Sequence, residues 1–259
     1  MDRLKFLYKY NNHYFAARHT RGFGVHSPFV YQFTQFVIYE RYYFYTFTII
    51  EKLRSKLLSD SRHIEILDYG TGDDKIKKLS EIVKREVSTP RCGQLLFRLI
   101  HYFKLRNILE LGTSVGLTTA YLAASSSEIH CVSLEGSQQI AEIANENIAV
   151  VGLQNVEIQV GNIDELLPRV IHQFDHLDLV FFDANHKYDA LIHYVDLCLE
   201  KIQSQTVFVV HDIHWSNDME LAWNKIKNYQ QVTSTIDLFY MGIVFFNPYL
   251  NNKHYKMRI

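Results

Sequence analysis

The sequence has little of three things: net charge, long apolar runs and paired cysteines. Its 259 residues carry 27 basic and 28 acidic side chains, so the formal net charge is −1. This balance argues against the strong global field of many nucleic-acid-binding proteins, so nucleic acid is an unfavoured partner. No apolar run approaches the roughly 20 residues that a membrane-spanning helix needs, and we expect no membrane association.

The cysteines are few and scattered. Cys92, Cys131 and Cys198 form no CxxC pair, which argues against structural zinc, and their odd number fits reduced, mostly buried thiols. The first 20 residues are too aromatic and polar for the apolar part of a secretory signal. Together these features favour a cytoplasmic protein.

Aromatic residues, in contrast, are abundant. The chain has 17 Tyr and 17 Phe, and seven aromatic residues fall within residues 36–50. Helix packing is the simplest interpretation of this crowding. A substrate wall or a dimer surface stays open as an alternative, because aromatic side chains supply a large contact area at low entropic cost.

Residues 1–92 are expected to be mostly helical. Apolar residues recur at helical spacing in RLKFLYKYNNHYFAA, HSPFVYQFTQFVI, TIIEKLRSKLLSD and DKIKKLSEIVKREV. The second stretch begins with Ser27, a residue type favoured at helix caps, followed by Pro28 at a first-turn position. No internal repeat or low-complexity linker is evident.

After the helical stretch QLLFRLIHYF, residues 93–259 alternate between strands and helices. We expect strands at 107–111, 129–134, 156–160, 177–182 and 206–210, and helices at 118–124, 138–150, 163–171, 188–201 and 219–228. This alternation predicts a parallel sheet covered on both faces. Two final apolar runs, 233–238 and 242–246, are separated by a short turn and therefore must pair antiparallel.

Two stretches, ILDYGTGDD (66–74) and ILELGTSVG (108–116), look like a buried strand that ends in an acid and a glycine turn. A nucleotide-binding loop also needs a following helix and a second parallel strand that ends in an acid. The second stretch meets both conditions, because LTTAYLAA follows it and IHCVSLE then ends in Glu135. Glu135 lies 135 − 110 = 25 residues after Glu110.

The first stretch lacks this context. It leads to a plausible helix, but STPRCGQ stands where the second buried strand should be. We therefore assign Gly70 and Gly72 to a structural turn. A flap over the active site that uses Asp73 or Asp74 is the alternative.

The ordered motifs resemble a known family. ILELGTSVGLTTAYLA followed by VSLEGS resembles the first two motifs of class I S-adenosylmethionine (SAM)-dependent methyltransferases, in particular the small-molecule O-methyltransferase branch with the catechol and caffeoyl-CoA enzymes. DLVFFDANHKYD resembles the fourth motif of that branch, and VFVVHDIHW lies where its fifth strand ends. The chain is also similar to an uncharacterised bacterial subgroup that shares HSPF and DIHWS. The resemblance spans about 94–246.

This resemblance implies a fold class and a domain division. The fold expected is α/β, a Rossmann-like methyltransferase fold with a seven-stranded, mostly parallel sheet and an antiparallel last strand. Residues 93–259 would form the SAM-binding domain, and residues 1–92 a helical N-terminal cap or extension.

The resemblance also implies which residues bind SAM. Glycines allow close approach of the backbone, hydroxyl side chains can bond the carboxylate end beside the helix N-terminus, and Glu110 orients the loop or the ammonium group. Glu135 is expected to accept both ribose hydroxyls. Ile163 would flank the adenine and Asp164 accept from its amino group, although Asp164 is equally explained as a helix N-terminal acid. The full expected set is Glu110, Gly112, Thr113, Ser114, Gly116, Thr118, Glu135, Gly161, Asn162, Ile163, Asp164 and Asp183.

Acidic and histidine residues follow two neighbouring strands. Asp183 ends the fourth strand and Asp212 the fifth, at the edge of an α/β sheet where ligands bind. In the resembling family an Asp at the first of these ends and an Asp–Asn pair at the second hold a divalent metal. Here the pair reads His211–Asp212. The metal ligands that the resemblance implies are therefore Asp183, His211 and Asp212. Histidine in that position either favours Mn²⁺, Fe²⁺ or Zn²⁺ over Mg²⁺ or removes the metal altogether.

Methyl transfer also needs a group that removes a proton from the acceptor. The family's catalytic lysine matches His186, which can act near neutral pH. We therefore predict His186, Asp183 and His214 as catalytic, with His211 as a further candidate, although each histidine alone is also explained as a hydrogen-bonded structural residue. Trp215 and Tyr188 are candidate walls of the acceptor pocket.

The expected activity is SAM-dependent O-methylation of a hydroxyl on a small molecule. A tRNA methyltransferase is an alternative, which the neutral charge and scarce basic clusters weigh against. A non-catalytic module that binds SAM or another nucleotide is a second alternative, favoured by His211. A homodimer is compatible with the aromatic N-terminal segment.

Overall fold

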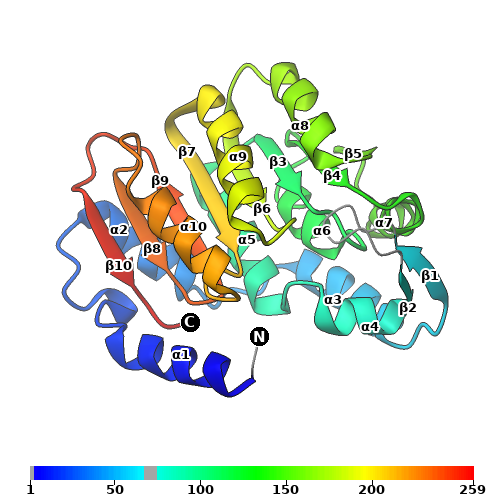
Figure 1. The fold of residues 1–259 in the computed structure, drawn as a ribbon, viewed down its shortest axis with the longest axis horizontal. Coiled ribbons are helices and arrows are strands. Elements are labelled where there is room, and N and C mark those ends of the chain that lie inside the picture. Colours follow the sequence, from blue (N-terminus) through cyan, green and yellow to red (C-terminus); the bar gives the residue numbers. More distant parts are fainter. Residues whose placement is uncertain (1–2, 67–74) are drawn as a thin grey trace. The chain divides into compact units, whose positions relative to one another are not determined.

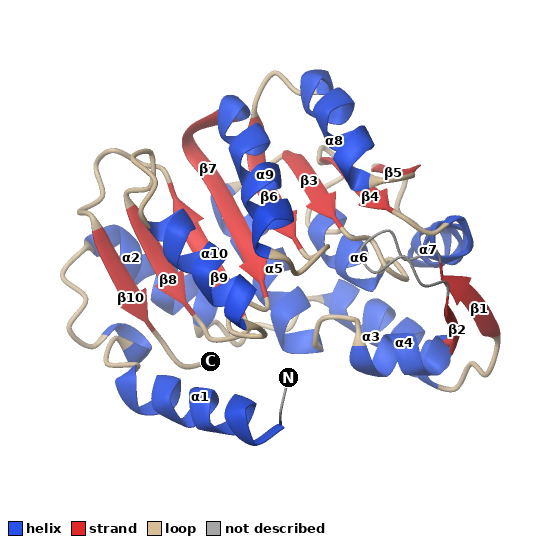
Figure 2. Ribbon diagram, viewed as in Figure 1, coloured by secondary structure: helices blue, strands red, loops and turns tan. Residues whose placement is uncertain are grey.

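The computed structural model describes residues 3–66 and 75–259. Its backbone contacts divide the chain into two compact units, which are taken in turn below (Figures 1 and 2). The first unit comprises residues 1–40 and 174–259, and the second comprises residues 41–173.

The second unit is built on three parallel strands in the order β3-β4-β5. Glycine turns and helices connect them in the alternation that the sequence predicts. The strands are β3 (Asn107–Leu111), β4 (His130–Glu135) and β5 (Val156–Val160), and the helices are α3 (Tyr45–Leu58), α4 (Leu79–Arg85), α5 (Pro90–Phe103), α6 (Leu117–Ala123), α7 (Gln138–Val151) and α8 (Ile163–Val170).

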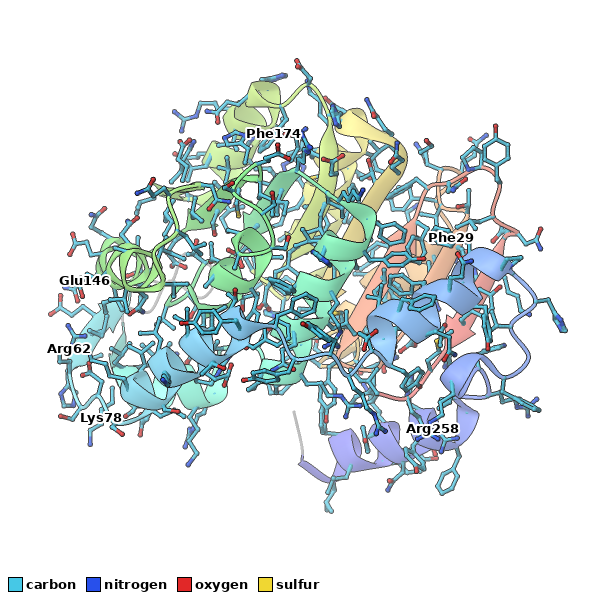
Figure 3. All side chains as sticks on the ribbon, turned by 180° about the vertical axis from the view of Figure 1, so that it is seen from behind. Phe29, Arg62, Lys78, Glu146, Phe174 and Arg258 are labelled. Carbon is cyan, nitrogen blue, oxygen red and sulfur yellow. The ribbon has the colours of Figure 1, made fainter. Side chains whose placement is uncertain are left out.

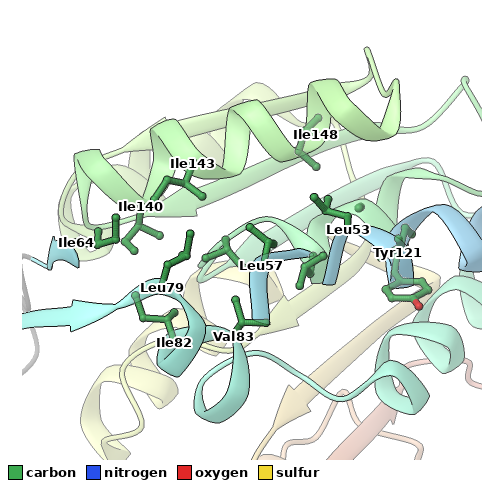
Figure 4. Packing of buried hydrophobic residues seen from close by; sticks show 14 of the residues in the cluster. Leu53, Leu57, Ile64, Leu79, Ile82, Val83, Tyr121, Ile140, Ile143 and Ile148 are labelled. Atoms are coloured by element: carbon green, nitrogen blue, oxygen red, sulfur yellow. The ribbon is translucent and has the colours of Figure 1, made fainter. Parts of the chain in front are cut away.

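The core of the second unit lies where α3, α4, α6 and α7 meet (Figure 4). Leu53 and Leu57 of α3, Ile82 of α4 and Tyr121 of α6 are buried here together with Ile140 of α7. The apolar spacing that predicts a helix over TIIEKLRSKLLSD thus also selects the buried face of α3. Elements on both sides of residue 92 share this core, so the two contact units do not follow the boundary between residues 1–92 and 93–259.

The first unit carries five strands in the order β10-β8-β9-β7-β6. The strands β6 and β7 are parallel, β9 is antiparallel to β7 and to β8, and β10 is parallel to β8. The elements are α1 (Arg3–Ala16), α2 (Pro28–Phe33), a π-helical turn (Thr34–Ile38), β6 (Leu177–Phe182), α9 (Tyr188–Cys198), β7 (Ile202–His211), α10 (Asn217–Lys227), β8 (Ser234–Asp237), β9 (Met241–Phe245) and β10 (Lys253–Lys256).

Helices cover both faces of the strands in the first unit. In Figure 1, α9 and α10 lie on one face, and α2 lies on the other. Figure 3, drawn from behind, shows Phe29 of α2 over the strands. Its ring and that of Phe33 each pack edge-on against Phe245 of β9, at centroid distances of 5.4 and 5.3 Å. Ser27 caps α2 by accepting from the Val30 N–H, as its place before Pro28 predicts.

In the part of the chain that the structure describes, the main sheet has eight strands, so the prediction of seven was wrong by one. The additional strand is β10, whose sequence KHYK contains no apolar run. Backbone pairing with β8 forms it, and the Ser234 hydroxyl, which donates to the Lys253 carbonyl at 2.9 Å, supports it. The antiparallel strand is confirmed as β9, but it is not the last strand, because β10 follows it.

The first glycine stretch does not begin a parallel strand unit. β1 (His63–Ile66) pairs antiparallel with β2 (Lys75–Lys78) in a separate two-stranded sheet. The helix predicted over DKIKKLSEIVKREV was therefore wrong for Lys75–Lys78, which pair with β1, and α4 begins only at Leu79. The turn with Gly70 and Gly72, and the alternative flap with Asp73 and Asp74, lie outside the described residues.

Among the described residues, no helix combines the length and apolar character required to cross a bilayer.

Candidate functional site

The loop after β3 turns sharply into the N-terminus of α6. Gly112 and Gly116 have φ values of +99° and +77°, and Ser114 between them has a φ of +48°. A Cβ atom at Gly116 would lie 3.2 Å from the backbone and Cβ of Ala144 in α7, so glycine permits both the turn and the close approach of the two helices. The loop therefore presents backbone at a helix N-terminus, as an anionic ligand end requires.

A buried polar network lies beneath this loop. Glu110 is fully buried and accepts hydrogen bonds from the hydroxyls of Ser133, at 2.6 Å, and Thr119. The Ser133 hydroxyl also shares a hydrogen bond with that of Thr113. Of the two predicted roles for Glu110, the geometry favours orientation of the loop. The Thr113 side chain is likewise engaged under the loop, a contact that sequence reasoning missed.

Glu135 ends β4 and has both carboxylate oxygens on backbone N–H groups. Its Oε2 accepts from Ser114 at 2.8 Å, and its Oε1 accepts from Ser137 at 2.9 Å. Burial raises the pKa of Glu135, and the backbone hydrogen bonds from Ser137, Ser114 and Gly136 act in the opposite direction. The structure thus brings Glu135 to the loop after β3, and each oxygen keeps lone pairs for further donors.

The turn after β5 adjoins the same residue. Gly161 has a φ of +147°, and its N–H donates to the Glu135 carbonyl at 2.9 Å. Asn162 caps α8 by accepting from the Asp164 N–H at 3.0 Å. Ile163 is half-buried and Asp164 exposed, while Thr118 on α6 is buried. The predicted SAM residues of the second unit therefore lie at the ends of its three strands, in the turns that follow them, or in the first turn of the next helix.

The first unit brings together a separate cluster of acids and histidines. His211, the last residue of β7, places Nδ1 2.8 Å from Oδ1 of Asp183, which follows β6. The Nε2 atom of His186 lies 3.8 Å from Asp183 Oδ1 and 3.6 Å from Asp212 Oδ2. The predicted convergence of the two strand ends is thus present in the structure.

Three residues of this cluster could bind a metal ion. Asp183, His186 and His211 each offer a ligand atom, and these atoms lie within 4.8 Å of one another. This donor set includes His186, which was not among the predicted ligands. It does not include Asp212, which was predicted. Two imidazoles and one carboxylate suit Mn²⁺, Fe²⁺ or Zn²⁺ better than Mg²⁺, which prefers oxygen ligands.

Asp212 has an unusual environment. Its φ is +54°, and its backbone N–H donates to the carbonyl of Tyr240. Burial raises the pKa of its carboxyl group and Asp183 adds to this effect, whereas the nearby His211 and His186 lower it.

His214 has different partners from the other histidines. Its Nδ1 lies 3.0 Å from Glu220 Oε1, and its Nε2 lies 3.0 Å from Asp237 Oδ2. Asp237 also contacts Nε2 of His13 at 2.9 Å, and Lys9 pairs with Glu220. Both ring nitrogens of His214 therefore have carboxylate partners, and its catalytic role stays a prediction.

Sequence reasoning missed this network, because its members are far apart in the chain. The one feature of the sequence that pointed to this network was an acidic residue, Asp237, within the apolar strand predicted at 233–238.

Aromatic side chains connect α1 to the same loops. The Phe6 ring lies 6.2 Å from Trp215 and 5.3 Å from Phe239, and Tyr10 lies 5.0 Å from Phe239. These contacts favour the packing interpretation for part of the aromatic N-terminus. Trp215 keeps 48% of its surface exposed, and its place in an acceptor pocket stays a prediction.

Known proteins are similar to this chain in the region of these sites. Residues 109–213 match the family described as "Methyltransferase domain". "O-methyltransferase imqG" of Aspergillus flavus is 30% identical over 115 residues, which are 42% of this chain and 46% of that protein. "Catechol O-methyltransferase" of Niastella koreensis is 32% identical over 100 residues, 38% of this chain and 45% of that protein. The chain thus spans less than half the length of these relatives.

Solved structures agree with the fold. An O-methyltransferase from Bacillus cereus in complex with SAH is 20% identical with a TM-score of 0.57, covering 79% of this chain and 92% of that one. The O-methyltransferase TomG from Streptomyces achromogenes in complex with SAM is 23% identical with a TM-score of 0.56, covering 62% and 82%. The fold is that of the Rossmann-like methyltransferases, and the predicted resemblance to the class I, SAM-dependent O-methyltransferase branch is confirmed.

Proposed function

We propose that the chain is a SAM-dependent methyltransferase that methylates a hydroxyl group of a small molecule. The observation that carries this proposal is the position of Glu135, whose carboxylate accepts from the Ser114 N–H in the glycine loop after β3. The matching methyltransferase family and two relatives named as O-methyltransferases support the reaction type.

In this proposal the second unit binds SAM. The backbone of Gly112–Gly116 and the N-terminus of α6 receive the amino-acid end, and Glu135 accepts the ribose hydroxyls. The turn at 161–164 receives the adenine, with Ile163 against the ring and Asp164 near its amino group. Asp183 stays a cofactor contact predicted from the sequence.

The cluster around Asp183 is proposed to remove the proton. During transfer the acceptor oxygen attacks the methyl carbon, the carbon–sulfur bond breaks, and its electron pair stays on sulfur to give S-adenosylhomocysteine (SAH). The acceptor's proton then passes to a base. The sequence favoured His186, but among these histidines only His211 lies within hydrogen-bond distance of Asp183 Oδ1. An Nδ1–H donated to Asp183 makes Nε2 the basic nitrogen of His211.

A divalent metal on the same residues is the alternative to a histidine base. Asp183, His186 and His211 would hold it, and the bound ion would polarise the acceptor hydroxyl as a Lewis acid. The donor chemistry favours Mn²⁺, Fe²⁺ or Zn²⁺.

Transfer of a radiolabelled methyl group from SAM tests the proposal. The purified chain is screened against phenols, hydroxy acids, lipids and tRNA, and we expect labelling of a small hydroxylated compound. Labelling of tRNA alone would replace the small-molecule assignment by an RNA methyltransferase. SAH binding without transfer to any acceptor would favour a non-catalytic binding module. No SAH binding at all would refute the proposal.

Two further predictions belong to this proposal. Residues 93–259 are assigned as the SAM-binding domain with 1–92 as its extension, and a homodimer is compatible with the aromatic N-terminal segment. Light scattering measures the second directly, and a monomer at assay concentration would refute it.

A further inference from the structure

The β1–β2 hairpin is attached to the turn that carries Glu135. Both backbone groups of Glu65 in β1 bond to residues just after that acid. The Glu65 N–H donates to Oε1 of Gln139 at 3.0 Å, and the Glu65 carbonyl accepts from the Ser137 hydroxyl at 3.3 Å. The backbone N–H of the same Ser137 donates to Glu135 Oε1 at 2.9 Å. One residue therefore connects the hairpin to the proposed ribose carboxylate.

Ser137 occupies a helix cap position without acting as a side-chain cap. It precedes α7 with extended backbone, where a serine hydroxyl ordinarily accepts from the first turn of the helix. Here it makes no side-chain cap hydrogen bond and donates to Glu65 instead. The side chain is 1% exposed, so this orientation is set by the hairpin packed against it.

The hairpin is also anchored in the core. Ile64 of β1 is 6% exposed and belongs to the same buried cluster as Ile140 and Ile143 of α7 and Leu79 of α4. Figure 4 shows Ile64 beside Ile140 in the first turn of α7. The apolar contact fixes where β1 lies, and the two hydrogen bonds fix the register of Glu65 against Ser137 and Gln139.

We propose that Gln139 and Ser137 are positioning residues, which fasten the β1–β2 hairpin to the turn after β4 and thereby hold Glu135 in place for the ribose of SAM. This inference rests on the proposed function. Strand β1, which leads into the first glycine stretch, then supports Glu135 in the SAM site that the second glycine stretch forms.

Gln139 gives the sharper test because its side chain is exposed and its neighbour provides a matched control. Gln138 is also exposed, but its amide donates to Glu142 one turn along α7. Calorimetry measures the Kd for SAH. We expect Gln139→Ala to raise this Kd about 5-fold, the effect of one hydrogen bond. Gln138→Ala and Gln139→Glu, which keeps an acceptor for the Glu65 N–H, should stay within about twofold of the wild type.

A double-mutant cycle separates positioning from general support of the fold. If Gln139 acts through Glu135, Gln139→Ala should cost little further affinity in a Glu135→Gln background. A full additional loss there, or a Gln139→Ala Kd equal to that of Gln138→Ala, overturns the inference while leaving the proposed function intact. Failure of the wild type to bind SAH overturns the proposed function and this inference with it.

Discussion

Asp237 is expected to be one of the most sensitive positions for stability. Its carboxylate is almost fully buried and accepts from Nε2 of His13 at 2.9 Å, Nε2 of His214 at 3.0 Å and the Phe239 N–H at 2.9 Å. It thereby joins α1, the loop after β7 and strand β8. Asp237→Asn keeps the size of the side chain and an acceptor for Phe239, but it removes the charge between the two imidazoles.

The expected loss follows from burial. Breaking a buried ion pair by changing one partner typically costs 3–5 kcal/mol, and the acceptor that Asn retains places this variant near the lower limit, at about 3 kcal/mol. For a chain of this length the loss corresponds to a fall in Tm of roughly 6–12 °C.

Urea unfolding and a thermal scan at pH 7 measure the loss. The matched control is Glu128→Gln, because Glu128 pairs with Arg106 at 2.6 Å while both side chains are more than 60% exposed. Such an exposed pair contributes about 0–1 kcal/mol. Equal losses for the two variants would refute the reasoning, since burial would then make no difference.

The pH dependence gives a second readout. Burial alone would raise the pKa of Asp237, but the hydrogen bonds from His13 and His214 outweigh it and lower the pKa. An acid whose pKa is lower in the folded chain than in the unfolded chain stabilises the fold when it is ionised. This stabilisation is fully present above the unfolded-state pKa of about 3.9, and it is lost as the pH falls through the folded-state pKa. The difference between wild type and Asp237→Asn should therefore begin to shrink below about pH 4. A constant difference from pH 7 to 3 would contradict this assignment.

Three further predictions concern the proposed active site. Glu135→Gln should raise the Kd for SAH about 10-fold or more, because the ribose hydroxyls lose a charged acceptor; calorimetry would show an unchanged Kd if the assignment is wrong. Gly116→Ala should lower the free energy of unfolding by about 1 kcal/mol more than Gly152→Ala, since both have positive φ but only Gly116 faces close neighbours. His211→Asn should reduce methyl transfer roughly 100-fold if His211 is the base, and a larger loss in His186→Ala would reassign that role.

The sequence was most informative where a feature depends on neighbours in the chain. A strand, a glycine turn and a helix from Asn107 to Ala123 follow from apolar periodicity and from the positive φ that Gly112 and Gly116 allow. The same pattern placed Glu135 at the end of the next strand. The strand β2 was missed because Lys75–Lys78 pairs with β1, and local spacing alone favoured a helix there.

The partners of charged side chains were beyond this kind of reasoning. His214 was predicted as catalytic from its place after β7, but Glu220 and Asp237 hold both of its ring nitrogens. His13 reaches the same Asp237 from 224 residues away.

By itself, the sequence determined the order of strands and helices from Asn107 to Phe245, the glycine loop and the acid that follows it, because these depend on short-range periodicity and backbone sterics. Only the tertiary structure decided that His211 faces Asp183, that His214 is engaged by carboxylates, and that Ser137 and Gln139 hold the β1–β2 hairpin. These pairings depend on which distant segments pack together. The burial of apolar side chains selects those segments, as where Ile64 of β1 packs with the buried face of α7.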